Sequence, residues 1–156
     1  MSDERLEARR RIAAPATRVW ELVSHPEGHV RIDGSRMLEA ALNAKPLTAV
    51  GDTFDMDMDR EPLGDVPLGK YQVRNWVTRI EPGHLIEWST NLIDKDAPVG
   101  HVYGWRIDAV SEAECDVANY TDWSDLPDEW KPRWPIVPLE MLERSVEKLQ
   151  RIVTSE

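Results

Sequence analysis

The chain has 156 residues, a length typical of one domain whose core is large enough to hold a cavity. Its 29 acidic residues outnumber its 19 basic ones, and the net charge of −10 excludes nucleic acid as the expected partner and disfavours an anionic membrane surface. The chain has seven Trp and three Tyr but one Phe. A buried indole or phenol usually needs a hydrogen-bond partner.

The N-terminal part of the chain predicts a strand followed by two short helices. Residues 6–12 alternate in polarity and predict an edge strand with one polar face. Pro15 suits the first position of a helix, and Pro26 ends that helix because the residue before a proline avoids the helical region. A second short helix or turn is predicted over residues 26–33.

The middle of the chain has the pattern of strands. Residues 53–60 show it most clearly, because Phe54, Met56 and Met58 alternate with three aspartates. Such alternation is typical of an antiparallel sheet with one buried and one solvated face. The predicted strands cover residues 36–42, 53–60, 71–80, 84–90, 101–110 and 115–123.

Long connections and a final helix complete the pattern. The connections 61–70 and 91–100 are long for a compact sheet and suggest lids or entrances. Residues 124–138 contain four prolines and predict an irregular segment, in which Trp130 and Trp134 either pack under the next helix or close a pocket. Packing is the favoured alternative. Residues 138–154 predict a helix, with its apolar stripe at Leu139, Leu142, Val146, Leu149 and Val153.

Five segments resemble the START-like superfamily, also called SRPBCC or Bet v 1-type helix-grip proteins. They are residues 12–24 (IAAPATRVWELVS), 77–88 (VTRIEPGHLIEW), 103–106 (YGWR), 120–124 (YTDWS) and 142–152 (LERSVEKLQRI). Within the superfamily the chain is most similar to the polyketide cyclase/dehydrase-like group. The resemblance spans nearly the whole chain, is strong for the fold and carries no shared catalytic motif.

The resemblance implies an α+β helix-grip fold over residues 1–156 as a single domain. Its seven-stranded antiparallel sheet wraps around the long C-terminal helix, with two short helices after the first strand. A cavity between the sheet and that helix is expected, and members of the superfamily bind or transform apolar small molecules. A fold alone is a weak argument for a function.

Features of the chain point to the cytoplasm. The first residues are charged and lack the apolar stretch of a signal peptide, and no stretch approaches the roughly 20 apolar residues of a membrane-spanning helix. A single cysteine, Cys115, cannot form an internal disulfide. We therefore expect a cytoplasmic protein without membrane insertion, either a monomer or a homodimer.

Possible metal and cofactor motifs are weak. Asp55, Asp57 and Asp59 resemble the start of a calcium loop, but Arg60 occupies the position that needs glycine. The three residues His25, His29 and Asp33 have helical spacing, yet Pro26 and Gly28 make one continuous helix doubtful. No phosphate loop, dinucleotide fingerprint or nucleophile elbow occurs. We expect no metal and no cofactor.

Residues of the expected cavity can be chosen from strand faces. His101, Tyr103 and Trp105 share one face, so His101 could serve as an acid or base and Tyr103 as a hydrogen-bond donor, with Asp33 as a further catalytic candidate. Trp76 and Trp88 either stack across a hairpin or face the cavity. The predicted ligand-binding residues are Met56, Met58, Trp76, Trp88, Tyr103, Trp105, Tyr120 and Leu142.

Three functions remain open from the sequence. The first is binding of a small hydrophobic or aromatic ligand between the sheet and the last helix. The second is a cyclase- or dehydratase-like enzyme that adds a positioned acid–base group to such a cavity. The third is a protein-interaction module, for which a large exposed apolar patch would be the evidence.

Overall fold

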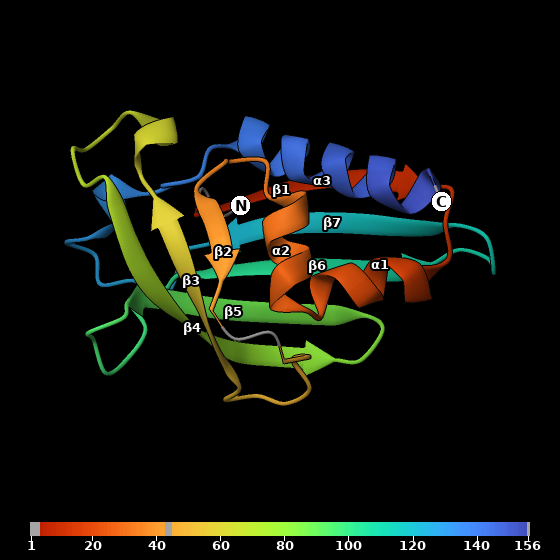
Figure 1. Ribbon diagram of the computed structural model, residues 1–156, viewed down its shortest axis with the longest axis horizontal. Coiled ribbons are helices and arrows are strands. Elements are labelled where there is room, and N and C mark those ends of the chain that lie inside the picture. The colour runs from red at the N-terminus through yellow and green to blue at the C-terminus, as the bar shows by residue number, and fades with distance from the viewer. Residues whose placement is uncertain (1–3, 43–44, 156) are drawn as a thin grey trace.

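The computed structural model describes residues 4–42 and 45–155. Within them lie seven strands and three α-helices in the predicted order (Figure 1). The elements are β1 (Arg5–Ile12), α1 (Ala16–Val23), α2 (Pro26–Ile32), β2 (Leu38–Ala41), β3 (Thr53–Asp59), β4 (Lys70–Glu81), β5 (Leu85–Leu92), β6 (Val102–Ala109), β7 (Cys115–Asp122) and α3 (Leu139–Thr154), with the short 3-10 helices η1 (Glu61–Leu63) and η2 (Lys131–Arg133). None of the described helices combines the length and apolarity needed to span a bilayer.

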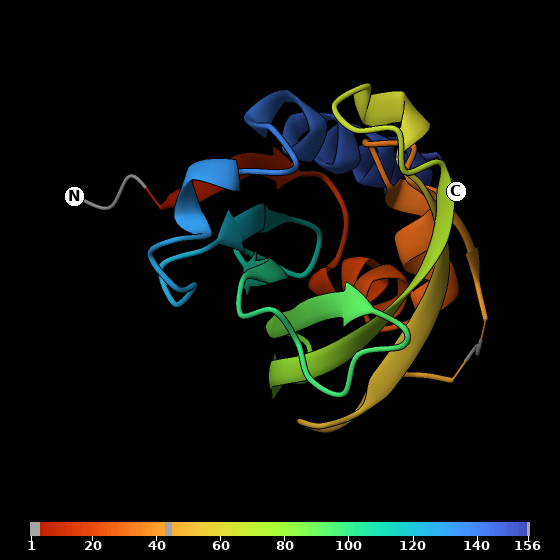
Figure 2. The ribbon, with the colours of Figure 1, turned by 90° about the vertical axis from the view of Figure 1, so that its left-hand side faces the viewer.

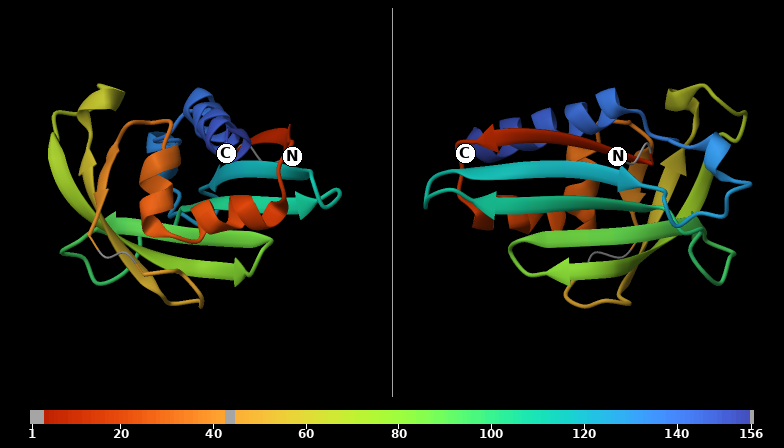
Figure 3. Two further views of the ribbon diagram at one scale, coloured as in Figure 1. Left: turned by 45° about the vertical axis from the view of Figure 1, so that its right-hand side comes forward. Right: turned by 180° about the vertical axis from the view of Figure 1, so that it is seen from behind.

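The seven strands form one antiparallel sheet in the order β1-β7-β6-β5-β4-β3-β2. The sheet curls around the three α-helices, which lie on its concave side (Figure 2). Seen from behind, the outer face of the sheet is turned to the viewer and the helices lie beyond it (Figure 3). This architecture confirms the α+β fold that the sequence predicts.

Alternation along the strands decides which side chains face the helices. On β3, Phe54 and Met56 are buried on the inner face. Asp55 and Asp57 point outward and pair with Arg74 and the Gln72 amide of β4, 2.8 and 2.9 Å away. The three aspartates of this strand therefore belong to the solvated face, as the alternation predicts.

Helix α3 occupies the concave side over β1 and β7. Its buried side chains recur every three or four residues, which places them on one stripe facing the sheet. Glu140 lies in its first turn and Arg151 in its last turn, the arrangement that the helix dipole favours. The buried residues are Met141, Leu142, Ser145, Val146, Leu149 and Val153.

A network of ion pairs covers part of the outer face. Glu7 of β1 accepts hydrogen bonds from Arg5, Arg9 and Arg106, which come from β1 and β6. Burial opposes ionisation of Glu7, but these hydrogen bonds outweigh it and lower the pKa of the carboxyl to about 2. The network ties together three adjacent strands, because β7 lies between β1 and β6.

The connection from α2 to β2 packs directly on α3. The Gly34 N–H donates to Ser145 Oγ over 2.8 Å, and the Lys148 ammonium donates to the Asp33 carbonyl over 2.9 Å. A Cβ at Gly34 would lie 2.5 Å from the Met141 carbonyl oxygen, so this position has no room for a side chain. The connection and α3 are thereby held at a fixed separation.

The predicted strand over residues 36–42 is too long, since β2 covers only Leu38–Ala41. Arg36 has a left-handed backbone with a φ of 63°, which no extended strand allows. The Asp33 carboxylate accepts the backbone N–H groups of Ser35 and Leu38 and holds this turn. Turn geometry, rather than polarity, sets where the strand begins.

Helices α1 and α2 meet through a buried histidine. The His29 Nε2–H donates to the Val23 carbonyl over 2.6 Å. Burial lowers the pKa of His29 to about 4, and the hydrogen bond to Val23 opposes this shift only in part. The ring is therefore neutral at pH 7 and is part of the core.

Two substitutions in the α2–β2 connection should have opposite effects on stability. Gly34→Ala should lower the free energy of unfolding by about 1–3 kcal/mol, because the new methyl group forces α3 away. Arg36→Gly should leave it unchanged or raise it by up to about 1 kcal/mol, because glycine adopts a positive φ without strain. Urea denaturation measures both, and equal effects would contradict this account.

The buried His29 should make the fold sensitive to acid. Its folded pKa lies below the ordinary value of 6.5, so its contribution to stability is complete above pH 6.5 and is lost as the pH falls to about 4. His29→Gln keeps an amide donor for Val23 and should flatten the pH dependence in this window by up to about 1.4 kcal/mol per pH unit.

The matched control is His84→Gln, because the His84 side chain is 43% exposed and lies outside the core. Urea denaturation at several pH values between 4 and 7 compares the three proteins. Parallel curves for the His29→Gln variant and the unchanged chain would refute the role assigned to His29.

Candidate functional site

A cavity of about 250 Å³ lies between the inner face of the sheet, α2 and the beginning of α3. Strands β3 to β7 form its floor, and the α2–β2 connection and α3 cover it. Three segments lie together at the left-hand end of the molecule in Figure 1. They are the β3–β4 connection, which contains η1, the β5–β6 loop and the segment between β7 and α3. Each contributes a lining residue, respectively Arg60, His101 and Trp134.

Six rings form a continuous aromatic chain along the cavity. It begins at Phe54, passes through His29 and Trp88, and continues through Tyr103 and His101 to Trp134. The successive ring centroids are 5.2, 4.6, 6.3, 5.3 and 4.8 Å apart. All six residues line the cavity. Such spacing allows edge-to-face and tilted contacts, which favour aromatic partners.

Strand pairing explains the centre of the aromatic chain. Trp88 of β5 and Tyr103 of β6 are direct cross-strand partners, and both point to the inner face. His101 lies two residues before Tyr103, so it continues the same face beyond the start of β6. His29 of α2 stacks over Trp88 from the opposite side of the cavity.

Polar groups are placed at a few points of this apolar lining. Burial raises the pKa of the Tyr103 phenol, which is therefore neutral and able to donate a hydrogen bond. The Asn75 and Asn119 amides are buried and donate to the Phe54 and Gly104 carbonyls, so both are held by the sheet itself. These groups can orient a ligand without placing a charge in the cavity.

Within the described residues, His101 is a buried polar residue of the lining with an unpartnered ring nitrogen. Its side chain is buried, and its Nδ1 has no hydrogen-bond partner among the described residues. Burial lowers the pKa of His101 to about 4, so the imidazole is neutral at pH 7. The Nε1 of neighbouring Trp134 is likewise buried and without a partner in the described part of the chain.

The carboxylate of Asp33 faces the cavity but is already used by the fold. One oxygen accepts the Ser35 hydroxyl over 2.7 Å and the Ser35 N–H over 3.1 Å, and the other accepts the Leu38 N–H over 3.0 Å. Asp33 is thus a structural anchor of the α2–β2 connection, which weakens its candidacy as a catalytic acid or base.

Arg60 is the one strongly charged group that the β3–β4 connection adds to the lining. Its guanidinium forms a bidentate ion pair with Asp65, with N–O distances of 2.8 and 2.7 Å. The Tyr71 phenol is close enough to contribute to its raised pKa. Asp65 neutralises this arginine, and the Asp33 carboxylate is held by Ser35 and Leu38, so the rest of the lining is mostly apolar.

The structure brings most of the predicted site residues to the cavity. The catalytic candidates Asp33, His101 and Tyr103 all line it. So do the predicted ligand-binding residues Met58, Trp88, Tyr103, Trp105 and Leu142.

Three predicted ligand-binding residues lie elsewhere. Met56 is on the inner face but is fully buried in the core and does not reach the cavity. Trp76 is paired with Ser89 of β5, on the face opposite to the adjacent Val77–Trp88 pair, so Trp76 and Trp88 do not stack. Tyr120 is buried on the outer face, where its hydroxyl donates to Glu87 over 2.8 Å.

The sequence contains one signal for the position of Tyr120. A Cβ on Gly104, its cross-strand partner, would lie 2.3 Å from the Tyr120 ring, so the tyrosine covers the space that the glycine leaves. Asn119, the preceding residue, therefore faces the cavity. A glycine opposite an aromatic residue in the adjacent strand indicates that the ring lies over the glycine, and it can be recognised once the pairing of the two strands is known.

Trp134 and His29 are the main lining residues that sequence reasoning did not select. Trp134 lies in the proline-rich segment, where packing under α3 is the favoured alternative, but its ring contacts His101 in the cavity. Trp130, by contrast, is 40% exposed. No periodic pattern covers this segment, so its side-chain directions were beyond prediction.

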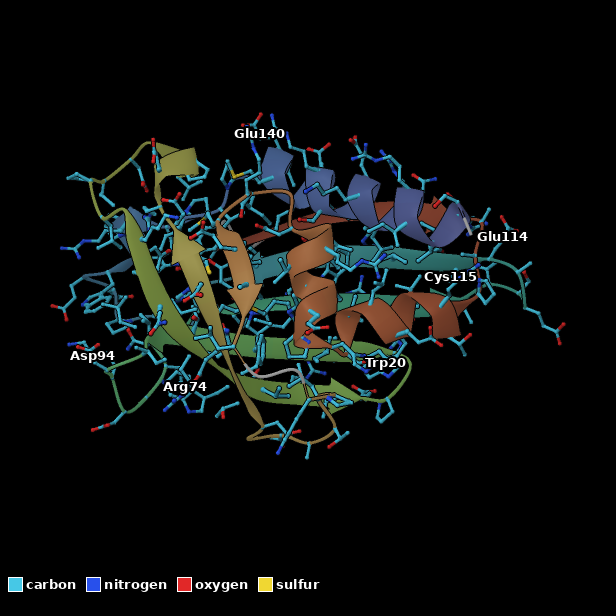
Figure 4. The ribbon with its side chains drawn as sticks, viewed as in Figure 1. Trp20, Arg74, Asp94, Glu114, Cys115 and Glu140 are labelled. Atoms are coloured by element: carbon cyan, nitrogen blue, oxygen red, sulfur yellow. The ribbon has the colours of Figure 1, made fainter. Side chains whose placement is uncertain are left out.

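Potential metal ligands are scattered. Within the described residues, no group of three or more His, Cys, Asp or Glu side chains is placed to hold a metal ion. Asp55 is paired with Arg74, which Figure 4 shows on the sheet surface. Cys115 lies at the opposite end of the molecule from the loop that carries Asp94 (Figure 4), and burial raises the pKa of its thiol.

Comparisons with known sequences find distant similarity to a mycobacterial protein. No protein-family model matches the chain. An uncharacterised protein of Mycobacterium tuberculosis is 29% identical over 100 residues, which cover 64% of this chain and 39% of that protein. The matched region thus spans less than half of the curated relative.

Comparisons with solved structures cover nearly the whole chain. A protein of Nitrosomonas europaea superposes with a TM-score of 0.69 at 14% identity, over 99% of this chain and 97% of that one. Truncated norcoclaurine synthase from Thalictrum flavum superposes with a TM-score of 0.63 at 14% identity, over 97% of this chain and 94% of the synthase. DynU16, from the dynemicin biosynthetic locus, gives 0.61 at 15% identity, over 99% of this chain and 48% of that one. The chain therefore has the helix-grip α+β fold that its sequence predicts.

Proposed function

We propose that the chain binds a small apolar or aromatic molecule in the cavity between the sheet and α3. The observation that carries this proposal is the row of six aromatic rings that lines a mostly apolar cavity of about 250 Å³. Ligand sites in proteins are concave, mostly apolar and supplied with a few placed polar groups, and this cavity has each of these properties.

The size of the cavity supports a ligand of about two aromatic rings. An apolar cavity of about 150 Å³ binds benzene, so a volume of about 250 Å³ leaves space for a second fused ring. Edge-to-face contacts with the rings of the lining would add to the hydrophobic gain. Two proteins of similar fold are named a synthase and a protein of a biosynthetic locus, which also favours a small organic molecule.

A cyclase- or dehydratase-like enzyme is the second candidate. It is favoured by Tyr103, whose neutral phenol faces the cavity and could donate a hydrogen bond to a substrate carbonyl. His101 argues against it, because a general base works best with a pKa near the operating pH and that of His101 is about 4. Binding is therefore the better supported function.

A substitution that fills the cavity should abolish binding. Val73 lines the cavity, so Val73→Phe should weaken the binding of naphthalene by at least about tenfold, because its ring takes the space of the ligand. Val66→Phe is the matched control, since Val66 is 46% exposed and lies outside the lining. Equilibrium dialysis with naphthalene measures both variants.

Native mass spectrometry of the purified chain gives an independent measurement. A retained small molecule that disappears in the Val73→Phe variant is the expected result. If naphthalene and a panel of two-ring aromatics fail to bind the unchanged chain, the proposal of ligand binding is wrong.

The enzyme alternative has its own measurement. Incubation of the chain with an aromatic β-hydroxyketone would lower the mass of the ligand by one water if Tyr103 promotes a dehydration, and Tyr103→Phe would stop the change without preventing binding. An unchanged ligand mass would leave binding as the function of the cavity.

A further inference from the structure

Among the described residues, two buried side-chain nitrogen atoms have no hydrogen-bond partner, and both belong to the cavity lining. They are His101 Nδ1 and Trp134 Nε1. Their ring centroids lie 4.8 Å apart, so the two side chains are in direct contact within the lining. Leaving a buried donor or acceptor unsatisfied costs about 1–3 kcal/mol, which makes two such atoms side by side an unusual arrangement in a folded core.

The two side chains come from distant parts of the sequence. His101 precedes β6, and Trp134 lies in the segment between η2 and α3. Both segments lie at the same end of the sheet in Figure 1. The Tyr103 ring packs on the other side of His101, with centroids 5.3 Å apart, so the two unsatisfied atoms lie at one end of the aromatic chain.

The chemistry of these atoms restricts the group that would satisfy them. An indole N–H only donates, so the ligand must present an acceptor to Trp134. His101 is neutral at pH 7, and its Nδ1 either donates or accepts according to the tautomer. A hydroxyl can accept from Trp134 and, by rotating, either donate to or accept from Nδ1. A carbonyl fits only one of the two tautomers.

An anionic group fits this position less well. Neither His101 nor Trp134 supplies a positive charge at pH 7, and the one arginine of the lining, Arg60, is already paired with Asp65. The net charge of the chain is −10, which further disfavours a carboxylate or phosphate ligand. A neutral hydroxyl is the group that matches both the hydrogen-bonding and the electrostatic requirements.

We propose that His101 Nδ1 and Trp134 Nε1 together bind a neutral hydroxyl group, so that the ligand of the cavity is a hydroxylated aromatic molecule of about two fused rings. The inference rests on the proposed binding function and adds the polar group that the ligand must carry. A site built to hydrogen-bond a hydroxyl discriminates against the analogue without it, because its buried polar atoms are then left unpaired.

Three probes of equal ring size test the inference at pH 7, namely naphthalene, 2-naphthol and 2-naphthoate. The full chain should bind 2-naphthol about tenfold more tightly than naphthalene, as expected for two added hydrogen bonds in a buried site. It should bind 2-naphthoate more weakly than 2-naphthol. Equilibrium dialysis gives the three dissociation constants under the same conditions.

Variants identify the atoms responsible. Trp134→Phe and His101→Phe should each remove most of the preference for 2-naphthol over naphthalene, and the far-UV circular dichroism spectrum of each variant shows that it folds. Trp76→Phe is the matched control, because Trp76 lies outside the cavity lining, and it should keep the full preference.

The outcomes separate the two proposals. Equal affinity of the full chain for naphthalene and 2-naphthol, or a preference that survives Trp134→Phe, overturns the hydroxyl site and leaves ligand binding in place. Tightest binding of 2-naphthoate overturns the hydroxyl site in favour of an anion site. If none of the three probes binds, both the proposed function and this inference are wrong.

Discussion

The pairing of β5 with β6 is the interaction on which the cavity depends. It sets Trp88 opposite Tyr103 on the concave face, where His29 and His101 extend the row of rings in both directions. A slip of one residue in β5 or β6 would turn the ring of that strand to the outer face and bring outer-face side chains such as Glu87 or Arg106 to the concave side. On the outer face, the Tyr120 ring of β7 lies over Gly104 of β6 and its hydroxyl donates to Glu87 of β5, which opposes such a slip.

Side-chain alternation made much of the fold predictable. The polarity of residues 53–60 was sufficient to place Phe54 and Met56 inside, and the spacing along residues 138–154 was sufficient to predict α3. Prediction from alternation failed where two apolar residues are adjacent, as at Trp76 and Val77, because either side chain could face inward. It also failed at Arg36, whose left-handed backbone shortens β2 without any signal in polarity.

The site was less predictable than the fold because its contacts cross between elements. A pattern within β6 shows that Tyr103 and Trp105 share a face, but not that His29 of α2 stacks on Trp88. Tyr120 reverses the usual preference, since the aromatic residue faces outward and the adjacent amide faces the cavity. Only the spatial partner of each residue explains such positions, and a single sequence does not contain that partner.

The two edges of the sheet have a consequence for how copies of this chain meet one another. Along β1, the residues Arg9, Arg10 and Arg11 are all exposed and paired with acidic or amide side chains. The other edge, β2, is short and its register shifts between Leu38 and Ala40. Charged residues, brief edge strands and irregular register each obstruct the addition of a foreign strand. The sheet is therefore protected at both ends against edge-to-edge aggregation, even though its curled shape leaves those edges unjoined.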